Sequence, residues 1–588
     1  MGNTGEVTGW IRRRFRVAGP PAGENGRPST GWPASLVSVR YVLRSSCRGR
    51  PPWEGGGCRP TDGSWEGAVR LADFLDYWAR EQPDAEFAVQ GGRRISYREA
   101  VTVTHRLANF LIAAGLGPGD RAAVVATNSI EYLLLYFAAA KTGVALVPVN
   151  YRLTPDEWAY ILGDSGSRVL FAGTRHVDAL HGIRDRLETV ERLVVLDGPG
   201  RPGWEDSAVL TEGPDTPPEC PVDEDGDVYQ MYTSGTTGRP KGVLLTNRAV
   251  TANIVQVALA LDNRPGERCL AALPLYHAGI VPTVFAPLSR GGSLWILESF
   301  DPRQAVRVLS EKGIGYTTLV PSMIQMCLVE VPDVSARRYP ALRLVHYGAS
   351  PIAEKTLQTA METFGCDFAQ SYGLTEATQG VTFLSPADHR RALAGERHLL
   401  LAAGRPAIAT EVRVVDEDDA PVPAGTTGEV VVRGPQLMRG YWRLPEESAA
   451  TLRGGWLHTG DIGTLDEEGY LFVSDRLKDV IVSGGENVYP RTVENVLFRH
   501  PAVADAAVIG VPDERWGETV KAVVVAKADA APTEEEIIGF CRERLAGFQR
   551  PRSVDFAEAL PRNPSGKVLK WLLRERYWPE GKRRVGGA

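Results

Sequence analysis

The strongest constraint on the fold is a regular alternation of short apolar runs with capped helical segments after residue 120. Apolar runs of strand length occupy residues 122–126, 144–149 and 167–172, and helical patterns separate them. Strands that alternate with helices in this way form parallel sheets covered by helices, and ligands bind such sheets beyond the carboxyl ends of the strands. We therefore expect the chemistry to lie in loops.

The helices between these runs carry clear boundary signals. Asn128 or Ser129 is placed to cap a helix that continues to Lys141, and Gly143 is placed to end it. The segment 154–157, Thr-Pro-Asp-Glu, provides a cap, a proline at the first helical position and a carboxylate at the third. These signals predict helices from about residues 129 and 155.

Chain length and changes of pattern predict several domains, since 588 residues exceed what one hydrophobic core supports. Residues 411–433 form short valine-rich runs separated by turns, as in a small antiparallel barrel, and a compact α+β pattern begins after residue 475. The predicted fold class is α/β. A large N-terminal domain, 69–475, has stacked parallel-rich sheets with helices plus the small barrel, and a small mobile α+β domain follows at 476–588.

Residues 1–68 are expected to be a disordered extension. The segment is rich in arginine, glycine, proline and serine and has little hydrophobic periodicity. An organelle-targeting peptide is the alternative, but its helical amphipathicity is poor here.

Composition excludes several classes of protein. The net charge of −6 disfavours general nucleic-acid binding, and the seven cysteines show no CxxC or zinc-ligand spacing, so they read as reduced intracellular thiols. The longest apolar stretch, 132–149, is interrupted by Lys141 and Gly143, so no membrane span is expected. A cytoplasmic enzyme with oxygen-ligated metal, if any, is the prediction.

One segment has the composition of a phosphate-binding loop. It reads Tyr232-Thr233-Ser234-Gly235-Thr236-Thr237-Gly238-Arg239-Pro240-Lys241-Gly242. Its glycines and hydroxyls allow close approach to phosphate oxygens, and Lys241 adds a cation. The spacing is not that of a Walker A loop, so a P-loop NTPase is disfavoured. A flexible linker is the alternative for the loop taken alone.

This segment resembles the signature of the adenylate-forming superfamily, which contains acyl-CoA synthetases, adenylation domains of peptide synthetases and luciferase. Further motifs follow in the family's order at 370–376 (QSYGLTE), 455–461 (GWLHTGD), 475–479 (DRLKD), 483–487 (SGGEN) and 561–567 (PRNPSGK). The resemblance covers about residues 70–578 and is specific, because independent motifs occur in one order.

The resemblance implies a site for ATP and Mg²⁺. Thr375 would face the α-phosphate, Glu376 and Thr233 would hold the metal, and Tyr372 would stack on adenine. Asp461 would bind the ribose hydroxyls, and Arg476 would contact ribose and phosphate. The full set of nucleotide and coenzyme A residues is Thr233, Ser234, Gly235, Thr236, Thr237, Gly238, Lys241, Gly348, Ala349, Ser350, Ser371, Tyr372, Gly373, Asp461, Arg476, Gly484 and Gly485.

The resemblance also assigns moving parts. Lys567 would bridge the substrate carboxylate and the α-phosphate, a role suited to a compact charge on a flexible stem. Lys478 would be the hinge about which the C-terminal domain rotates, bringing Gly484 and Gly485 beside the pantetheine channel. His277 would stand at the junction of the acyl and thiol tunnels, and a buried structural histidine is an equal alternative.

The predicted reaction is ATP-dependent activation of a hydrophobic, fatty carboxylic acid and transfer of the acyl group to coenzyme A. Expected partners are the acid, ATP and CoA, with peripheral membrane contact and a monomer or homodimer left open. Three alternatives remain: an acyl-AMP ligase that loads a carrier protein, an aryl or alicyclic acid CoA ligase, and a catalytically silent nucleotide-binding homologue.

Overall fold

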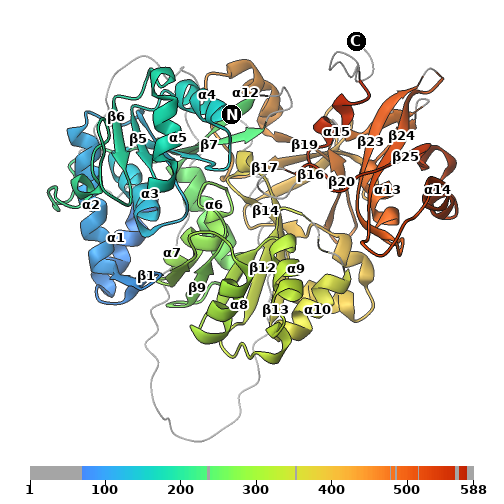
Figure 1. Ribbon diagram of the computed structural model, residues 1–588, viewed down its shortest axis with the longest axis horizontal. Helices are drawn as coiled ribbons and strands as arrows, with labels where there is room; N and C mark the ends of the chain where they lie inside the picture. Colours follow the sequence, from blue (N-terminus) through green and yellow to red (C-terminus); the bar gives the residue numbers. More distant parts are fainter. Residues whose placement is uncertain are drawn as a thin grey trace, which may run out of the picture. The chain divides into compact units, whose positions relative to one another are not determined.

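The computed structural model describes residues 69–234, 239–350, 352, 354–476, 479–483, 486–513, 515–562 and 568–578. The extension predicted for 1–68 lies outside these residues. Within them the architecture is α/β, with two large mixed sheets, a four-stranded antiparallel sheet and a further sheet near the C-terminus (Figure 1). The predicted fold class is confirmed, and the domain boundary at 475/476 stays a prediction.

The first large sheet has the strand order β18-β8-β7-β4-β3-β5-β6. Strands β4, β3, β5 and β6 run parallel, β7 joins them in parallel, and β8 and β18 add antiparallel pairs at one edge. The bounds are β3 Arg121–Val125, β4 Ala145–Val149, β5 Val169–Ala172, β6 Arg192–Val195, β7 Asp227–Ser234, β8 Pro240–Thr246 and β18 Gly440–Tyr441.

The second large sheet has nine strands in the order β15-β14-β13-β12-β11-β9-β10-β1-β2. Its centre, from β1 to β13, is parallel, and the outer strands pair antiparallel. The bounds are β1 Glu86–Gln90, β2 Arg93–Ser96, β9 Arg268–Ala271, β10 Ser293–Ile296, β11 Tyr316–Leu319, β12 Leu344–Gly348, β13 Asp367–Gly373, β14 Gly380–Leu384 and β15 Arg405–Pro406.

Two smaller sheets complete the strands. The antiparallel sheet β16-β17-β19-β20 has the bounds Glu411–Val415, Gly428–Arg433, Leu457–Leu465 and Leu471–Arg476, and it contains the segment predicted as a small barrel. The C-terminal sheet orders β22-β21-β24-β23, with β25 paired to β24, and has the bounds Glu486–Val488, Ile481–Ser483, Gly517–Ala526, Val503–Asp513 and Ser553–Phe556.

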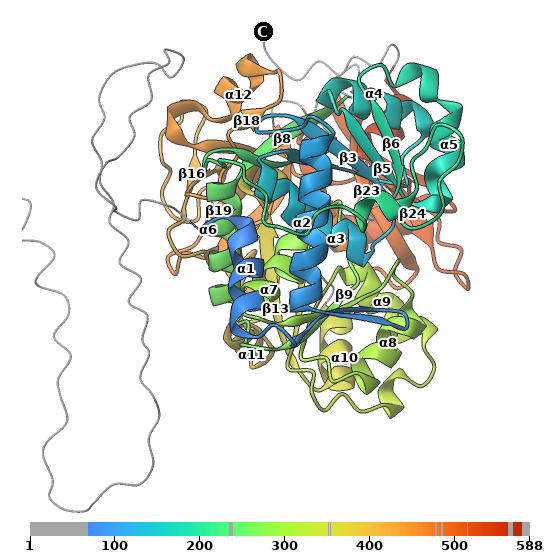
Figure 2. The same ribbon diagram turned by 90° about the vertical axis from the view of Figure 1, so that its left-hand side faces the viewer.

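The helices cover the sheets. Figure 2 shows α1 and α2 beside one another, and both contact α3. The bounds are α1 Leu71–Glu81, α2 Tyr97–Ala113, α3 Ile130–Thr142, α4 Pro155–Ser165, α5 Val177–Gly182, α6 Asn247–Ala260, α7 Ala286–Ser289, α8 Pro302–Glu311, α9 Pro321–Glu330, α10 Glu354–Phe364, α11 Pro386–Leu393, α12 Pro445–Thr451, α13 Pro490–Leu497, α14 Glu534–Arg542 and α15 Lys570–Glu575. A π-helical turn, η5, spans Val281–Phe285 immediately before α7.

The predicted helix boundaries agree with the structure. Ser129 caps α3 by accepting a hydrogen bond from the Tyr132 amide, and Gly143 ends the helix with a φ of 71°. Thr154 forms the expected capping box with Glu157 at the start of α4. Helix α3 buries every side chain except two charged ones, so it is a core helix without a solvent face.

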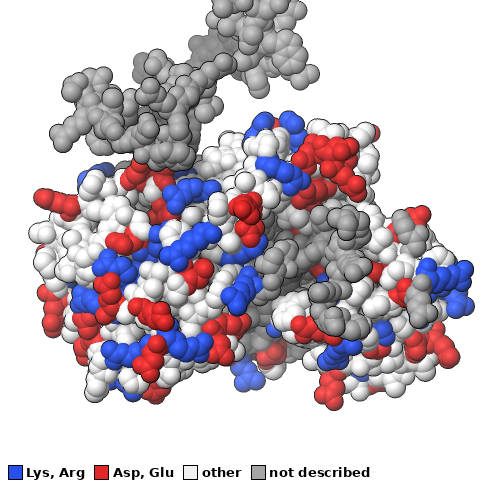
Figure 3. All heavy atoms as spheres, turned by 90° about the horizontal axis from the view of Figure 1, so that it is seen from above, with Lys and Arg blue, Asp and Glu red and all other residues white. Residues whose placement is uncertain are grey.

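Among the residues that the structure describes, none of the helices combines the length and the apolar character needed to span a membrane. On the face drawn in Figure 3, acidic and basic side chains of the described residues are interspersed, in keeping with the modest net charge.

A buried charge cluster attaches the edge strand β18 to the first sheet. Asp227, at the start of β7, accepts a hydrogen bond from Arg439 at 2.7 Å and lies 3.5 Å from Arg121 on β3. The Arg121 guanidinium also stacks over Trp442 at 3.6 Å from the ring centroid. Burial raises the pKa of Asp227, against the two arginines that lower it. The cluster fixes the backbone on both sides of Tyr441.

We predict that Asp227→Ala destabilises the protein by about 3–5 kcal/mol, because removal of Asp227 leaves the charge of the buried Arg121 uncompensated. Chemical denaturation monitored by tryptophan fluorescence measures the loss. The matched control is Asp225→Ala, which breaks an exposed ion pair with Arg248 and should cost at most about 1 kcal/mol. Equal stability losses in the two variants would contradict the role given to the cluster.

Candidate active site

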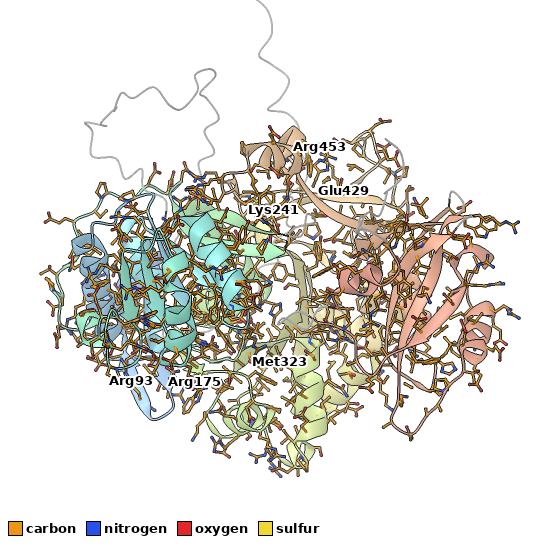
Figure 4. The ribbon with its side chains drawn as sticks, turned by 45° about the horizontal axis from the view of Figure 1, so that its top comes forward. Arg93, Arg175, Lys241, Met323, Glu429 and Arg453 are labelled. Carbon is orange, nitrogen blue, oxygen red and sulfur yellow. The ribbon has the colours of Figure 1, made fainter. Side chains whose placement is uncertain are left out.

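The hairpin of β7 and β8 positions the predicted phosphate-binding residues. Thr233 and Lys241 face each other across the hairpin, and Ser234 pairs with Pro240 one step closer to the loop. Residues 235–238, the loop itself, lie outside the described residues. Lys241, labelled in Figure 4, places its ammonium 5.3 Å from the ring centroid of Tyr441. The hairpin therefore presents a hydroxyl and a cation on adjacent strands.

Glu376 lies where three distant segments meet. Its Oε1 accepts a hydrogen bond from the Tyr441 hydroxyl at 3.0 Å, and the Thr233 hydroxyl lies 3.5 Å from the same oxygen. Its backbone carbonyl accepts from the amide of Met438 at 2.8 Å. The two predicted metal residues are thus side by side, and their oxygens suit a hard cation such as Mg²⁺. No group of three or more His, Cys, Asp or Glu in the described part of the chain is arranged to hold a metal ion, so phosphate and water oxygens would complete the coordination.

Tyr441 is a site residue that sequence reasoning did not identify. It belongs to the two-residue strand β18, which pairs with β8 and therefore lies beside the hairpin. An aromatic residue ahead of a helix start looks like ordinary core packing, and only the strand pairing places its hydroxyl on Glu376.

A tight turn holds Thr375 and Glu376 in place. Thr378 has a φ of 63°, and the Gln379 amide donates to the Ala377 carbonyl at 2.6 Å. A Cβ on Gly373 would come within 1.4 Å of the Gln379 carbonyl oxygen, so the close approach requires glycine at that position. Positive φ at a threonine marks a backbone held by its surroundings, as is common at functional sites.

Tyr372 and Asp461 form the second predicted contact. The Tyr372 hydroxyl donates to Asp461 Oδ2 at 2.6 Å, and Asp461 is 3% exposed. Arg476 lies directly opposite Asp461 on β20, but its side chain is outside the described part of the structure. The residues assigned to adenine and ribose are therefore adjacent in space.

Glu429 supports the bulged part of β19 that carries Asp461. It is labelled in Figure 4 on β17, and its two carboxylate oxygens accept from the Gly460 amide at 3.0 Å and pair with His458 Nδ1 at 2.9 Å. Thr459 adds a hydrogen bond to the Val430 carbonyl at 2.6 Å. The motif around Asp461 is thus a hydrogen-bonded bulge within β19, between β17 and β20.

The segment Gly348, Ala349 and Ser350 leaves the carboxyl end of β12, as expected for a ligand-binding edge. Gly348 pairs with Ser371 on β13, Ala349 has a φ of 68°, and the side chains of Ala349 and Ser350 are exposed. Ser371 itself is buried, and its hydroxyl makes hydrogen bonds to His346 and Gln379. The structure therefore brings the segment 348–350 next to Tyr372.

His277 is half-buried, and its Nε2 has no hydrogen-bond partner within the described residues. Burial, aided by Arg152, lowers its pKa to about 4, so the ring is neutral at physiological pH. The ring lies 4.4 Å from that of Tyr276. Both interpretations given above for His277 stay open.

Several predicted residues cannot be placed. Gly235, Thr236, Thr237, Gly238, Lys478, Gly484, Gly485 and Lys567 lie outside the described residues, as does the side chain of Ser234. Their roles stay predictions.

The fold is α/β, and it brings the Thr233 hydroxyl, the Tyr441 hydroxyl and the Glu376 carboxylate together beside the β7–β8 hairpin. The family model of the AMP-binding enzymes matches residues 75–442, and the model of the AMP-binding enzyme C-terminal domain matches residues 492–567. The chain belongs to this family of adenylate-forming enzymes, and the resemblance drawn from the motifs is confirmed.

Named relatives act on different acids. The chain is 39% identical to the fatty acid–[acyl-carrier-protein] ligase ScoC of Streptomyces coeruleorubidus, covering 88% of this chain and 98% of the relative. It is 40% identical to the feruloyl-CoA synthase of an Amycolatopsis species, covering 85% and 97%. The solved fatty acyl CoA synthetase of Mycobacterium tuberculosis superposes with a TM-score of 0.71 at 34% identity, covering 86% and 98%.

We predict an acid-sensitive contribution to stability from His346, which is fully buried on β12. Burial lowers its pKa from 6.5 to about 3. The unfolded chain therefore binds the extra proton, and stability falls as pH drops from about 6.5 toward 3. The stability advantage of wild type over His346→Gln should shrink by about 2 kcal/mol between pH 7.5 and pH 5, at about 1.4 kcal/mol per pH unit.

Urea denaturation at the two pH values provides the measurement. His398→Gln, which removes an exposed histidine, is the control. A pH-independent difference between wild type and His346→Gln would show that the folded protein accommodates the protonated ring.

Proposed function

We propose that this enzyme activates a carboxylic acid with Mg-ATP to an acyl-adenylate, releasing pyrophosphate, and then transfers the acyl group to the thiol of coenzyme A. The observation that carries the proposal is the convergence of Thr233, Glu376 and Tyr441 beside the phosphate-binding hairpin. Tyr372 and Asp461 add a polar contact suited to adenosine. Both reactants are anions, so positioning and charge neutralisation provide the acceleration.

Each described residue has a definite task in the first step. Asp461 accepts hydrogen bonds from the ribose. Tyr372 packs on the adenine ring, while its hydroxyl donates to the carboxylate of Asp461. Glu376 and Thr233 would hold Mg²⁺, which would neutralise phosphate charge when bound. Thr375, on the braced turn, reaches the α-phosphate. The carboxylate oxygen of the substrate attacks the α-phosphorus, and the bond to pyrophosphate breaks.

The remaining roles rest on the sequence motifs. Lys567 bridges the attacking carboxylate and the α-phosphate. Rotation about Lys478 then withdraws that lysine and brings Gly484 and Gly485 to the thiol channel, where the thiol attacks the adenylate carbonyl and AMP leaves. In this proposal domains 69–475 and 476–588 move against each other.

Two second candidates have specific support. The similarity to a fatty acid–carrier-protein ligase favours a carrier-bound thiol as the acceptor, and the similarity to a feruloyl-CoA synthase favours an aryl acid. Measuring pyrophosphate release and thioester formation with a panel of acids, with and without CoA, distinguishes these two candidates from the main proposal. Adenylation without CoA thioester supports carrier loading, and no release with any acid refutes the proposed activity.

We predict that Lys567→Ala lowers acyl-adenylate formation by at least about 100-fold, because the variant loses the charge that stabilises the transition state. Thioester formation from supplied acyl-adenylate should largely survive, since the lysine has by then left the site. Pyrophosphate release and thioester yield are measured separately. The control is Lys355→Ala, on the exposed surface of α10. Equal loss of both half-reactions would refute the role of Lys567.

We predict that Glu376→Gln raises the Mg²⁺ concentration needed for half-maximal adenylation and lowers the rate about 100-fold at saturating metal, because a neutral amide binds a hard cation weakly. Magnesium titrations of pyrophosphate release test this. Glu362→Gln, an exposed glutamate on α10, is the matched control. If Glu376→Gln kept the wild-type Mg²⁺ dependence, Glu376 would not be a metal ligand.

A further inference from the structure

A closed set of contacts holds one face of the β7–β8 hairpin. Five side chains from four segments of the chain form it, and we call them the hairpin bracket. They are Arg121 on β3, Asp164 on α4, Gln230 and Tyr232 on β7, and Trp442 just after β18. Arg121 and Gln230 are buried, and the other three are half-buried. The reaction proposed above gives none of them a task, although Tyr232 directly precedes Thr233.

The hydrogen bonds of the hairpin bracket run in one direction. Arg121 can only donate, so its Nε donates to Gln230 Oε1 at 3.3 Å, and Gln230 Nε2 donates to the Tyr232 hydroxyl at 2.9 Å. The Tyr232 hydroxyl in turn donates its proton to the carboxylate of Asp164 at 2.5 Å. Burial and this hydrogen bond raise the pKa of Tyr232, so the hydroxyl keeps its proton. A donor to a carboxylate makes one of the stronger hydrogen bonds in proteins.

Trp442 closes the ring of contacts. Its Nε1 donates to the backbone carbonyl of Asp164 at 2.8 Å, and the Arg121 guanidinium lies 3.6 Å from its ring centroid. Its backbone amide donates to the Gly242 carbonyl at 2.7 Å, and Gly242 is the residue opposite Tyr232 in the hairpin. Strand β3, helix α4 and the segment after β18 are therefore all attached to the same part of the hairpin.

The hairpin bracket and the predicted phosphate-binding residues lie on opposite faces of the hairpin. Tyr232 and Thr233 are neighbours on β7, so their side chains alternate between the two faces. The Tyr232 hydroxyl bonds to α4, whereas the Thr233 hydroxyl lies beside Glu376. Lys241 pairs with Thr233 across the hairpin and therefore shares its face.

Helix α4 contacts both strands of the hairpin. Tyr160 and Asp164 are four residues apart and lie on one face of this helix. Asp164 accepts the hydrogen bond from Tyr232 on β7, and the Tyr160 hydroxyl donates to the Pro240 carbonyl on β8 at 3.1 Å. Each contact falls one position before a predicted phosphate-binding residue of the same strand.

The assignments made above indicate which phosphates the hairpin would bind. Tyr372 and Asp461 are assigned to adenosine and Thr375 to the α-phosphate. The hairpin is left with the β- and γ-phosphates, which depart together as pyrophosphate and which AMP lacks. A hydroxyl and a cation stabilise such charge best when they are held in position beforehand, so the spacing of Thr233 and Lys241 matters.

We propose that Asp164 and Tyr232 are positioning residues for ATP, and that their hydrogen bond holds the hairpin so that Thr233 and Lys241 meet the β- and γ-phosphates. The inference rests on the nucleotide site of the proposed function, and it gives a task to α4, which lies outside every sequence motif described above. Loss of the hydrogen bond should weaken the binding of ligands that contain these two phosphates and spare AMP.

Equilibrium binding of AMP, ATP and pyrophosphate, each with Mg²⁺, tests this proposal without any acid substrate. Tyr232→Phe removes only the hydroxyl group. It should weaken the binding of ATP and of pyrophosphate by about 10-fold, the size expected for a hydrogen bond to a charged group, and change the Kd of AMP by less than about twofold. With an acid that the wild type activates, the KM for ATP should rise by the same factor and the KM for the acid should stay constant.

Further variants identify the hydrogen bond as the cause. Asp164→Ala should match Tyr232→Phe, whereas Asp164→Asn keeps an oxygen that accepts the hydroxyl proton and should stay within about threefold of the wild-type ATP affinity. Because the two single variants remove the same bond, the double variant should be no weaker than the worse of them. Tyr470→Phe is the matched control: it removes a hydrogen bond from the Tyr470 hydroxyl to Asp388, 2.6 Å long, and should leave every nucleotide affinity unchanged.

The outcomes separate this inference from the proposed function. Equal weakening of AMP and ATP by Tyr232→Phe, or an unchanged ATP affinity, overturns the positioning role. A double variant in which the two effects multiply shows independent contributions and overturns it as well. Neither result bears on adenylation, which pyrophosphate release measures separately. Selective weakening of ATP in a protein that releases no pyrophosphate with any acid supports the positioning role and refutes the proposed activity.

Discussion

The hydrogen bonds that converge on Glu376 are the interaction on which the rest of the site depends. They connect the Thr233 hydroxyl on β7, the Tyr441 phenol on β18 and the Glu376 carboxylate on the short turn after β13. Strands β7 and β18 belong to the first large sheet, and β13 belongs to the second. The hydrogen bond from the half-exposed Arg439 to the buried Asp227 holds the β18 segment at the distance this requires. Stability of the first sheet and the geometry around the Glu376 carboxylate are therefore coupled through a few residues.

Local signals predicted much of the fold. The cap at Ser129, the glycine after α3 and the capping box at Thr154 are each decided by residues within a few positions, so sequence alone locates them. The neighbours of α3 were not predictable in the same way. Its sequence is apolar all round except for Glu131 and Lys141, which indicates burial, but strands that contact it, such as β7, lie far away in the chain.

The same difference between local signals and long-range contacts applies to the candidate site. Motif residues such as Tyr372, Asp461 and Glu376 could be named from the sequence, because the motifs that contain them resemble those of a known family in the same order. Their mutual contacts, and the part played by Tyr441, depend on strand pairing across long separations. The hydrogen-bonded chain of His346, Ser371 and Gln379 could not be predicted for the same reason, because His346 and Gln379 stand alone in the sequence and are connected only through Ser371.

The turn between Gly373 and Gln379 has a consequence for how such an enzyme diversifies. Its backbone admits no side chain at 373, since a Cβ would collide with the Gln379 carbonyl. The side chain of Gln379 carries no such restriction from that contact. Substitutions at position 379 can therefore accumulate while the main chain of the Thr375–Glu376 turn stays where it is.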